Sequence, residues 1–176
     1  MSTTPTEPTE PTEIPEMMRL LQKHGDLFDK YFSEDLDEQS AVLKAHLLIE
    51  GVIRDFSYRS VRNPQHLRGS RLNFHQIVAL ARSLIFFTTP GLDCYWGMID
   101  QLNKLRNLMA HELEPDQAKF DKCRKALMSL SGSDTLNGSL SFLCGGMNSL
   151  LTVSLELQKR ERLSEAEREA LGLQTS

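Results

Sequence analysis

The chain has 176 residues, 40% of them hydrophobic, so it can bury one sizeable core and a single domain is expected. Its formal net charge of −4 equals the charge of the four glutamates in the first sixteen residues, which contain no basic residue. The remainder is formally neutral, which argues against broad nucleic-acid affinity, because nonspecific binding to phosphates depends chiefly on lysine and arginine. Any contact with RNA must then be local.

The first residues repeat a Pro-Thr-Glu triplet, STTPTEPTEPTEIPE over residues 2–16. Such a segment has almost no apolar surface to offset the entropy lost on ordering, so a disordered tail is predicted for residues 1–16. A helical domain is expected over residues 17–163, followed by a charged Glu/Arg-rich tail over 164–176. No basic region followed by an apolar run is present at the N-terminus, so no secretory signal is predicted.

Apolar residues recur at helical spacing, after a short apolar stretch that follows the tail. The pattern and its Pro and Gly terminators predict five helices, over residues 37–59, 73–87, 93–114, 116–130 and 140–160. The arginine-rich segment after the first of these is interpreted as a solvated loop, with a phosphate-binding patch as the alternative. No sustained two-residue alternation indicates a strand. The predicted fold class is all-α, an up-and-down bundle of about five helices.

Three further patterns bear on location and on metal binding. The three cysteines are odd in number and widely spaced, so neither a disulfide framework nor structural zinc is expected, and no metal or cofactor is predicted. The uncharged stretch from Thr135 to Leu155 is rich in glycine, asparagine and serine, so it is interpreted as part of a buried helix and not as a membrane span. A cytoplasmic protein without membrane contact is expected.

The helix predicted over residues 93–114 ends with LRNLMAHEL, residues 105–113, which contains an Arg-x-x-x-x-His arrangement with asparagine directly after the arginine. Together with a long apolar first helix (KAHLLIEGVIRDF), a second helix before the motif and another helix after it, this resembles the HEPN superfamily. Its members are helical bundles, many of them dimeric ribonucleases in which Arg and His of both subunits meet in a shared cleft. The resemblance implies a HEPN-like fold with Arg106 and His111 as the catalytic pair.

The chemistry of these two residue types fits RNA cleavage without a metal. Attack by the 2′-hydroxyl needs a base to remove its proton, and histidine titrates near neutrality. The crowded phosphoryl group needs a cation, and arginine presents a planar fork that matches phosphate oxygens. The alternative interpretation is that Arg106 is a solvated helix residue and that His111 complements the negative end of the helix dipole.

Helical geometry constrains how the pair could act. Positions five residues apart lie about 140° apart around a regular helix, so Arg106 and His111 do not share a face. Asn107 and His111 do share one, and Asp100 and Asn103 extend the same polar strip. Arg106 could reach His111 by curling its side chain, by local unwinding before Pro115, or from a second subunit, so a homodimer is expected. Asn107, Asn103 and Glu50 are predicted to orient the catalytic side chains or to contact the phosphate or RNA.

A second pair lies in the first long helix, where His46 and Glu50 are four residues apart. His46 is interpreted as a hydrogen-bonded histidine at the edge of the core. Glu50 lies among apolar residues, so it should need a cation if buried, and either a pair with Arg106 or an exposed position is expected. A zinc site that combines both residues with His111 is not favoured, because a His-x-x-x-Glu pair alone is a weak metal signal. His24, His66 and His75 are expected in loops or at the surface.

The leading functional prediction is a metal-independent endoribonuclease that serves as a toxin or as a stress or defence effector. Its expected partners are a second copy of the chain, RNA or a nucleotide, and an antitoxin or regulatory protein. One alternative is a noncatalytic regulator or adaptor similar to the mannitol-operon repressor family, and another is a nucleotide-binding sensory module. Toxins regulated by a partner nucleotidyltransferase often carry a tyrosine two residues after the histidine. Here that position is Leu113, which argues against that form of regulation.

Overall fold

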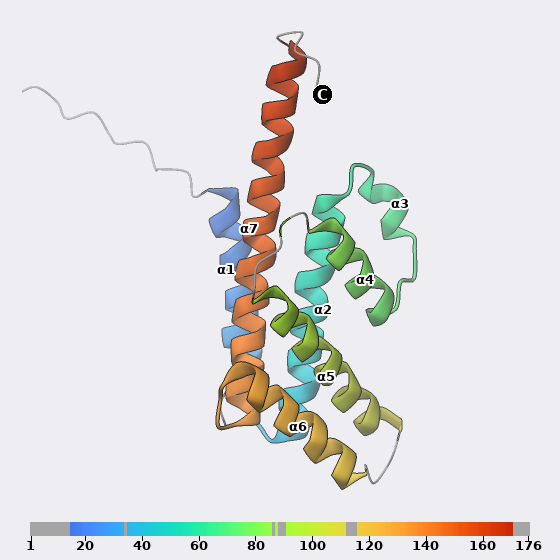
Figure 1. Ribbon diagram of the computed structural model, residues 1–176, viewed down its shortest axis with the longest axis vertical. Coiled ribbons are helices and arrows are strands. Elements are labelled where there is room, and N and C mark those ends of the chain that lie inside the picture. Colours follow the sequence, from blue (N-terminus) through green and yellow to red (C-terminus); the bar gives the residue numbers. More distant parts are fainter. Residues whose placement is uncertain (1–14, 34, 86, 88–90, 112–115, 171–176) are drawn as a thin grey trace, which may run out of the picture.

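The protein is described here from a computed structural model, which describes residues 15–33, 35–85, 87, 91–111 and 116–170. Within these ranges the chain forms seven helices and no strand, so the predicted all-α class is confirmed (Figure 1). The helices are α1 (Glu16–Tyr31), α2 (Glu38–Ser60), α3 (Pro64–Arg68), α4 (Phe74–Leu84), α5 (Leu92–His111), α6 (Gln117–Ser131) and α7 (Leu136–Ala170).

Helix ends are set by local sequence chemistry. Asp37 precedes α2 and its side chain accepts a hydrogen bond from the Ser40 backbone N–H at 2.9 Å. Asn73 and Gln76 form a reciprocal capping box at the start of α4. These contacts satisfy backbone N–H groups that have no partner within the helix. At the other end of α6, Gly132 adopts φ 70°, a left-handed conformation that favours glycine as a helix terminator.

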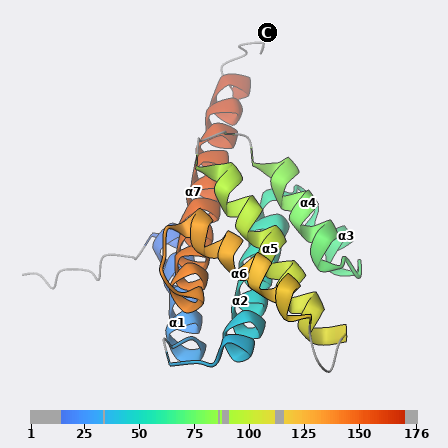
Figure 2. The ribbon, with the colours of Figure 1, turned by 60° about the horizontal axis from the view of Figure 1, so that its bottom comes forward.

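Helix α2 lies at the centre of the bundle and packs against α1, α3, α4, α5 and α7. The largest fully buried side chains come mainly from α2, α5 and α7. Helices α5 and α6 lie side by side, and the two views show them crossing in front of α2 (Figures 1 and 2). The central position of α2 therefore places its polar side chains directly beside those of α4 and α5.

Helix α7 contains the segment Leu136–Ser164, which is long and apolar enough to cross a membrane by length and composition. In this structure the segment packs against α1, α2, α5 and α6, and Leu140, Leu143 and Met147 on it are fully buried. A core helix of a soluble protein meets the same criterion. The segment that the sequence predicts to belong to a buried helix is thus a core helix of the bundle.

The structure differs from the sequence predictions in helix number and extent. About five helices were expected, whereas α1 and the short α3 are additional. The apolar stretch before α2 forms the full helix α1, and Glu16, assigned to the tail, is its first residue. Helix α4 ends at Leu84 and not at Phe87, and α7 continues through Ala170 into the segment assigned to the charged tail. Residues 1–14 and 171–176 of the two predicted tails lie outside the described residues.

Candidate functional site

Helix α5 carries the Arg-x-x-x-x-His motif and is anchored by its apolar face. Leu102 and Leu105 are fully buried on this face. Arg106 and Asn107, which follow Leu105, therefore lie away from the centre of the buried face of α5. Arg106 is half-buried and Asn107 is exposed. The backbone is helical through His111, the last residue of α5, but the side chain of His111 lies outside the described residues. The contact between the predicted catalytic pair is therefore untested.

Among the described residues, the side chain of Arg106 has few partners. Its Nη1 donates one hydrogen bond to Asn107 Oδ1 at 3.1 Å. The ion pairs formed within the described ranges of the chain all involve other cations. A guanidinium has five N–H donors, so most of those of Arg106 remain available.

His46 on α2 is the polar residue that the fold places opposite Arg106. Its exposed fraction is 6%, and its ring lies against Phe74 of α4 with ring centroids 4.1 Å apart. Its Nε2 atom is buried and forms no hydrogen bond within the described part of the chain. The prediction that His46 lies at the edge of the core is therefore confirmed. The predicted hydrogen bond is not formed by Nε2 within the described part of the chain.

Several neighbours determine the protonation of His46. Burial is the largest influence and lowers the pKa of its imidazole, and the positive charge of Arg106 lowers it further. Glu50 and a polar interaction with Asn103 act in the opposite direction, although Asn103 does not complete a hydrogen bond to Nε2. The net result is a neutral imidazole at neutral pH. The packing of α2 on α5 thus brings His46, Asn103 and Arg106 together.

Glu50 binds Arg54 and not Arg106, the partner expected from the sequence. Both Nε and Nη2 of Arg54 donate to Glu50 Oε1, at 2.9 and 2.7 Å, and Nη2 also donates to the Leu72 carbonyl at 2.7 Å. The expected pair of Glu50 with Arg106 is therefore wrong. The reason is local, because residues four apart on α2 lie on the same face and Arg54 is the nearer cation. The Oε2 atom of Glu50 lies 3.9 Å from His46 Nδ1.

No zinc site is formed by the residues whose positions are described. Among them, no group of three His, Cys, Asp or Glu side chains is arranged to hold a metal ion. The combination of His46, Glu50 and His111 was not favoured from the sequence, and the His111 side chain is outside the described ranges.

One polar cluster was missed from the sequence. His24, expected at the surface, is buried on α1, with Nε2 3.1 Å from Asp55 Oδ2 on α2, and Lys23 forms an ion pair with the same carboxylate. The hydrogen bond with His24, followed by Lys23, lowers the pKa of Asp55. The residues lie 31 and 32 positions from Asp55, so no local spacing could reveal the cluster. The contacts of His24 and Lys23 with Asp55 join α1 to α2.

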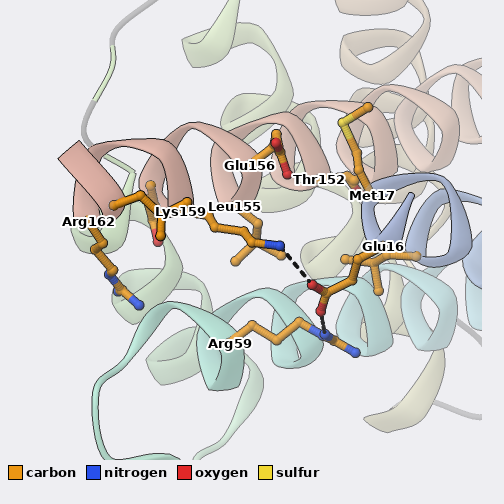
Figure 3. Close-up of a pocket in the computed structure, with 11 residues that line it drawn as sticks. Glu16, Met17, Arg59, Thr152, Leu155, Glu156, Lys159 and Arg162 are labelled. Atoms are coloured by element: carbon orange, nitrogen blue, oxygen red, sulfur yellow. Dashed lines mark hydrogen bonds and ion pairs between the residues drawn. The ribbon is translucent and has the colours of Figure 1, made fainter. Parts of the chain in front are cut away.

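A cavity of about 320 Å³ lies where the start of α1 meets the end of α2 and α7 (Figure 3). Figure 3 shows Glu16 between two cations, with Oε1 3.1 Å from Arg59 Nη1 and Oε2 3.3 Å from Lys159 Nζ. Arg162 Nη2 donates to the Ser60 carbonyl at 2.5 Å. Glu16 is thus engaged by Arg59 and Lys159, and the cavity is a joint between three helices.

Comparison of the chain with protein-family models, with curated proteins and with solved structures gives no match. The function is therefore inferred from the Arg-x-x-x-x-His motif, from the order of the helices and from the geometry around Arg106.

Proposed function

We propose that this protein is a metal-independent endoribonuclease of HEPN type, in which Arg106 stabilises the phosphoryl group and His111 acts as base or acid. The observation that carries the proposal is the state of Arg106. It is a half-buried guanidinium with one hydrogen bond to Asn107 and no carboxylate partner in the described part of the chain. A cation with spare, preoriented donors suits a phosphate oxygen, for which the arginine fork has matching geometry.

The surroundings of Arg106 support anion binding. Its buried neighbour His46 is held neutral, and Glu50, the nearby carboxylate, is already bound to Arg54. Among the described residues, no adjacent anion therefore cancels the positive charge of Arg106. A phosphate that reached Arg106 would supply the missing opposite charge.

The catalytic steps follow from the two residue types. His111 would remove the proton from the 2′-hydroxyl, whose oxygen then attacks the adjacent phosphorus and displaces the 5′-oxygen, which takes up a proton. Arg106 would stabilise the negative charge that develops on the nonbridging oxygens. The products are a 2′,3′-cyclic phosphate and a 5′-hydroxyl, and no metal participates.

The regular geometry of α5 favours a homodimer. Arg106 and His111 both lie within the regular helix α5. Positions five apart on such a helix lie about 140° from each other, so His111 of one subunit is proposed to act with Arg106 of the other across a two-fold axis. In a cell such an enzyme would serve as a toxin or as a stress or defence effector, restrained by an antitoxin or regulatory protein.

The proposal is tested by incubating purified full-length protein with single-stranded RNA in EDTA. We expect cleavage that leaves 2′,3′-cyclic phosphate ends and that falls by roughly 10²- to 10⁴-fold in His111→Ala, the usual contribution of a positioned general acid or base. The matched control is His75→Ala, which removes an exposed histidine at the start of α4. Undiminished cleavage by folded His111→Ala protein, or no cleavage of varied RNAs by the wild type, would contradict the proposal.

A noncatalytic regulator or adaptor, similar to the mannitol-operon repressor family, is the second candidate. It is favoured by an apolar groove of about 440 Å³ between α1 and α2. Leu27, Tyr31 and Leu47 line this groove and are exposed, with 68% exposure at Leu47. Exposed apolar surfaces of this kind commonly mark protein contacts. Absence of cleavage together with capture of a protein partner through this groove would favour the regulator, whereas nucleotide binding without cleavage would favour a sensory module.

A further inference from the structure

A second groove, of about 540 Å³, runs between α5 and α6 beside the candidate site. The residues on which its character depends are Lys104, Asn107 and Leu108 from α5 and Lys119, Lys122 and Cys123 from α6. The two helices follow each other in the chain and lie side by side as a helical hairpin (Figure 2), and residues of both line the groove.

The groove concentrates positive charge in a chain whose net charge is −4. Three lysines line it, and none of the described residues that line it is acidic. Lys104 and Lys122 are exposed and form no ion pair within the described ranges, while Lys119 Nζ lies 3.3 Å from Asp116 Oδ2. Two cations without an ion pair among the described residues and one partly neutralised cation therefore line a common space.

The groove leads to Arg106. Asn107 lines the groove and also accepts the hydrogen bond from Arg106, so one asparagine borders both features. From Lys104 to Asn107 the groove follows α5 toward its C-terminal end, where His111 lies. A chain of phosphates lying along the lysines would therefore be delivered to Arg106.

We infer that this groove binds the phosphodiester backbone of single-stranded RNA and feeds the strand to Arg106; the RNA as ligand rests on the proposed function. Lysines spaced along one seam match a repeating negative charge, and the favourable term is the release of counterions from the strand. Leu108 and Cys123 add apolar surface against which an unstacked base can lie, a contact that a base-paired duplex does not offer.

The inference is tested with a short 2′-O-methyl RNA, which lacks the attacking hydroxyl and therefore reports binding without cleavage. Fluorescence anisotropy of the labelled strand is measured over a range of salt concentrations for the full chain and for the Lys104→Gln/Lys122→Gln variant. We expect the variant to bind at least about tenfold more weakly. We also expect the slope of log affinity against log salt to become shallower by about 1.4, because each lysine contact to a single strand contributes about 0.7.

The control is Lys30→Gln/Lys125→Gln, which removes the same charge from exposed positions on α1 and α6 that do not line the groove. Its slope should equal that of the wild type. Equal losses in the two double variants would overturn the inference, because binding would then follow overall charge alone, and so would failure of the wild type to bind the strand. All four positions are exposed, so unchanged circular dichroism is expected in both variants.

Cleavage of unmodified RNA separates this inference from the proposed function. If the wild type binds RNA through the groove but does not cleave it, the binding role of the groove is supported and the proposed ribonuclease activity is contradicted. If the wild type cleaves RNA and the Lys104→Gln/Lys122→Gln variant binds RNA normally, the ribonuclease activity is supported and the RNA-binding role of the groove is overturned.

Discussion

Arg54 on α2 and Arg106 on α5 are both half-buried, yet their environments are opposite. Arg54 makes two hydrogen bonds to Glu50 and one to the Leu72 carbonyl. Within the part of the chain that the structure describes, Arg106 makes one hydrogen bond, to the neutral side chain of Asn107.

The difference separates a structural cation from a candidate functional one. Arg54 joins α2 to the segment before α4, so its charge and most of its donors are used within the fold. Arg106 forms no ion pair with any carboxylate among the described residues, so it contributes little to holding those parts of the fold together. Such an arrangement is explained if the missing partner is a ligand, and a phosphate is the anion that best fits a guanidinium.

Loss of Arg54 should have the largest effect on stability. Arg54→Met leaves the Glu50 carboxylate, only 24% exposed, and the Leu72 carbonyl without their donors, and we expect the free energy of unfolding to fall by about 2 kcal/mol. Urea denaturation followed by circular dichroism measures the change. The control is Arg160→Met, which breaks the same kind of pair with Glu156 at a site where Arg160 is 72% exposed, and it should cost under about 0.5 kcal/mol. Equal losses would contradict the structural role of Arg54.

The buried His46 should make stability depend on pH. Because burial lowers its pKa, the unfolded chain binds the proton more readily than the folded chain. The contribution of His46 is therefore fully present above about pH 6.5 and is lost as the pH falls below that value, by at most about 1.4 kcal/mol per pH unit for one group. Replacement of this residue in His46→Leu should flatten the decrease between about pH 7 and pH 5, whereas replacement of an exposed histidine in His66→Leu should not. The same decrease in His46→Leu as in the wild type would show that another group is responsible.

Asn107 should have the smallest effect. Its side chain accepts the one hydrogen bond that holds Arg106, and removing it in Asn107→Ala frees the guanidinium without removing its charge. We expect the cleavage rate to fall by about three- to tenfold, the equivalent of one ordinary hydrogen bond of about 1 kcal/mol, with no change in the free energy of unfolding. A decrease as large as that of His111→Ala would mean that Asn107 itself contacts the reacting phosphate.

The periodic parts of the fold could be predicted from the sequence, and the parts set by distant contacts could not. Apolar spacing locates α2 within one residue of its observed bounds, and the Pro-Gly pair correctly separates α4 from α5. Helix α7 was expected to end near residue 160, but pairs such as Glu156 with Arg160 support a charged helix that continues in solvent through Ala170. No apolar period marks that extension.

The same division holds for the site. The location of Arg106 and Asn107 at the end of α5 follows from the motif and from the buried face of that helix. The pairing of Glu50 with Arg54 was also present in the sequence as a four-residue spacing, and it was overlooked in favour of a distant partner. In contrast, the burial of His24 depends on Asp55, 31 residues away, so it required the three-dimensional fold.

Parallel measurements on Arg106→Lys and Arg54→Lys test most directly whether Arg106 is the phosphate-binding cation and Arg54 a structural one. Both variants keep the positive charge and remove the planar fork. For each variant, kcat/KM for RNA cleavage in EDTA and the free energy of unfolding are measured together. We expect Arg106→Lys to lose at least about 100-fold in kcat/KM, the scale of one lost transition-state donor, with stability within about 0.5 kcal/mol of the wild type. Arg54→Lys should lose stability and retain most of its kcat/KM. Wild-type cleavage by Arg106→Lys, or a loss of stability in Arg106→Lys as large as in Arg54→Lys, would contradict the assignment of Arg106 as the phosphate-binding cation.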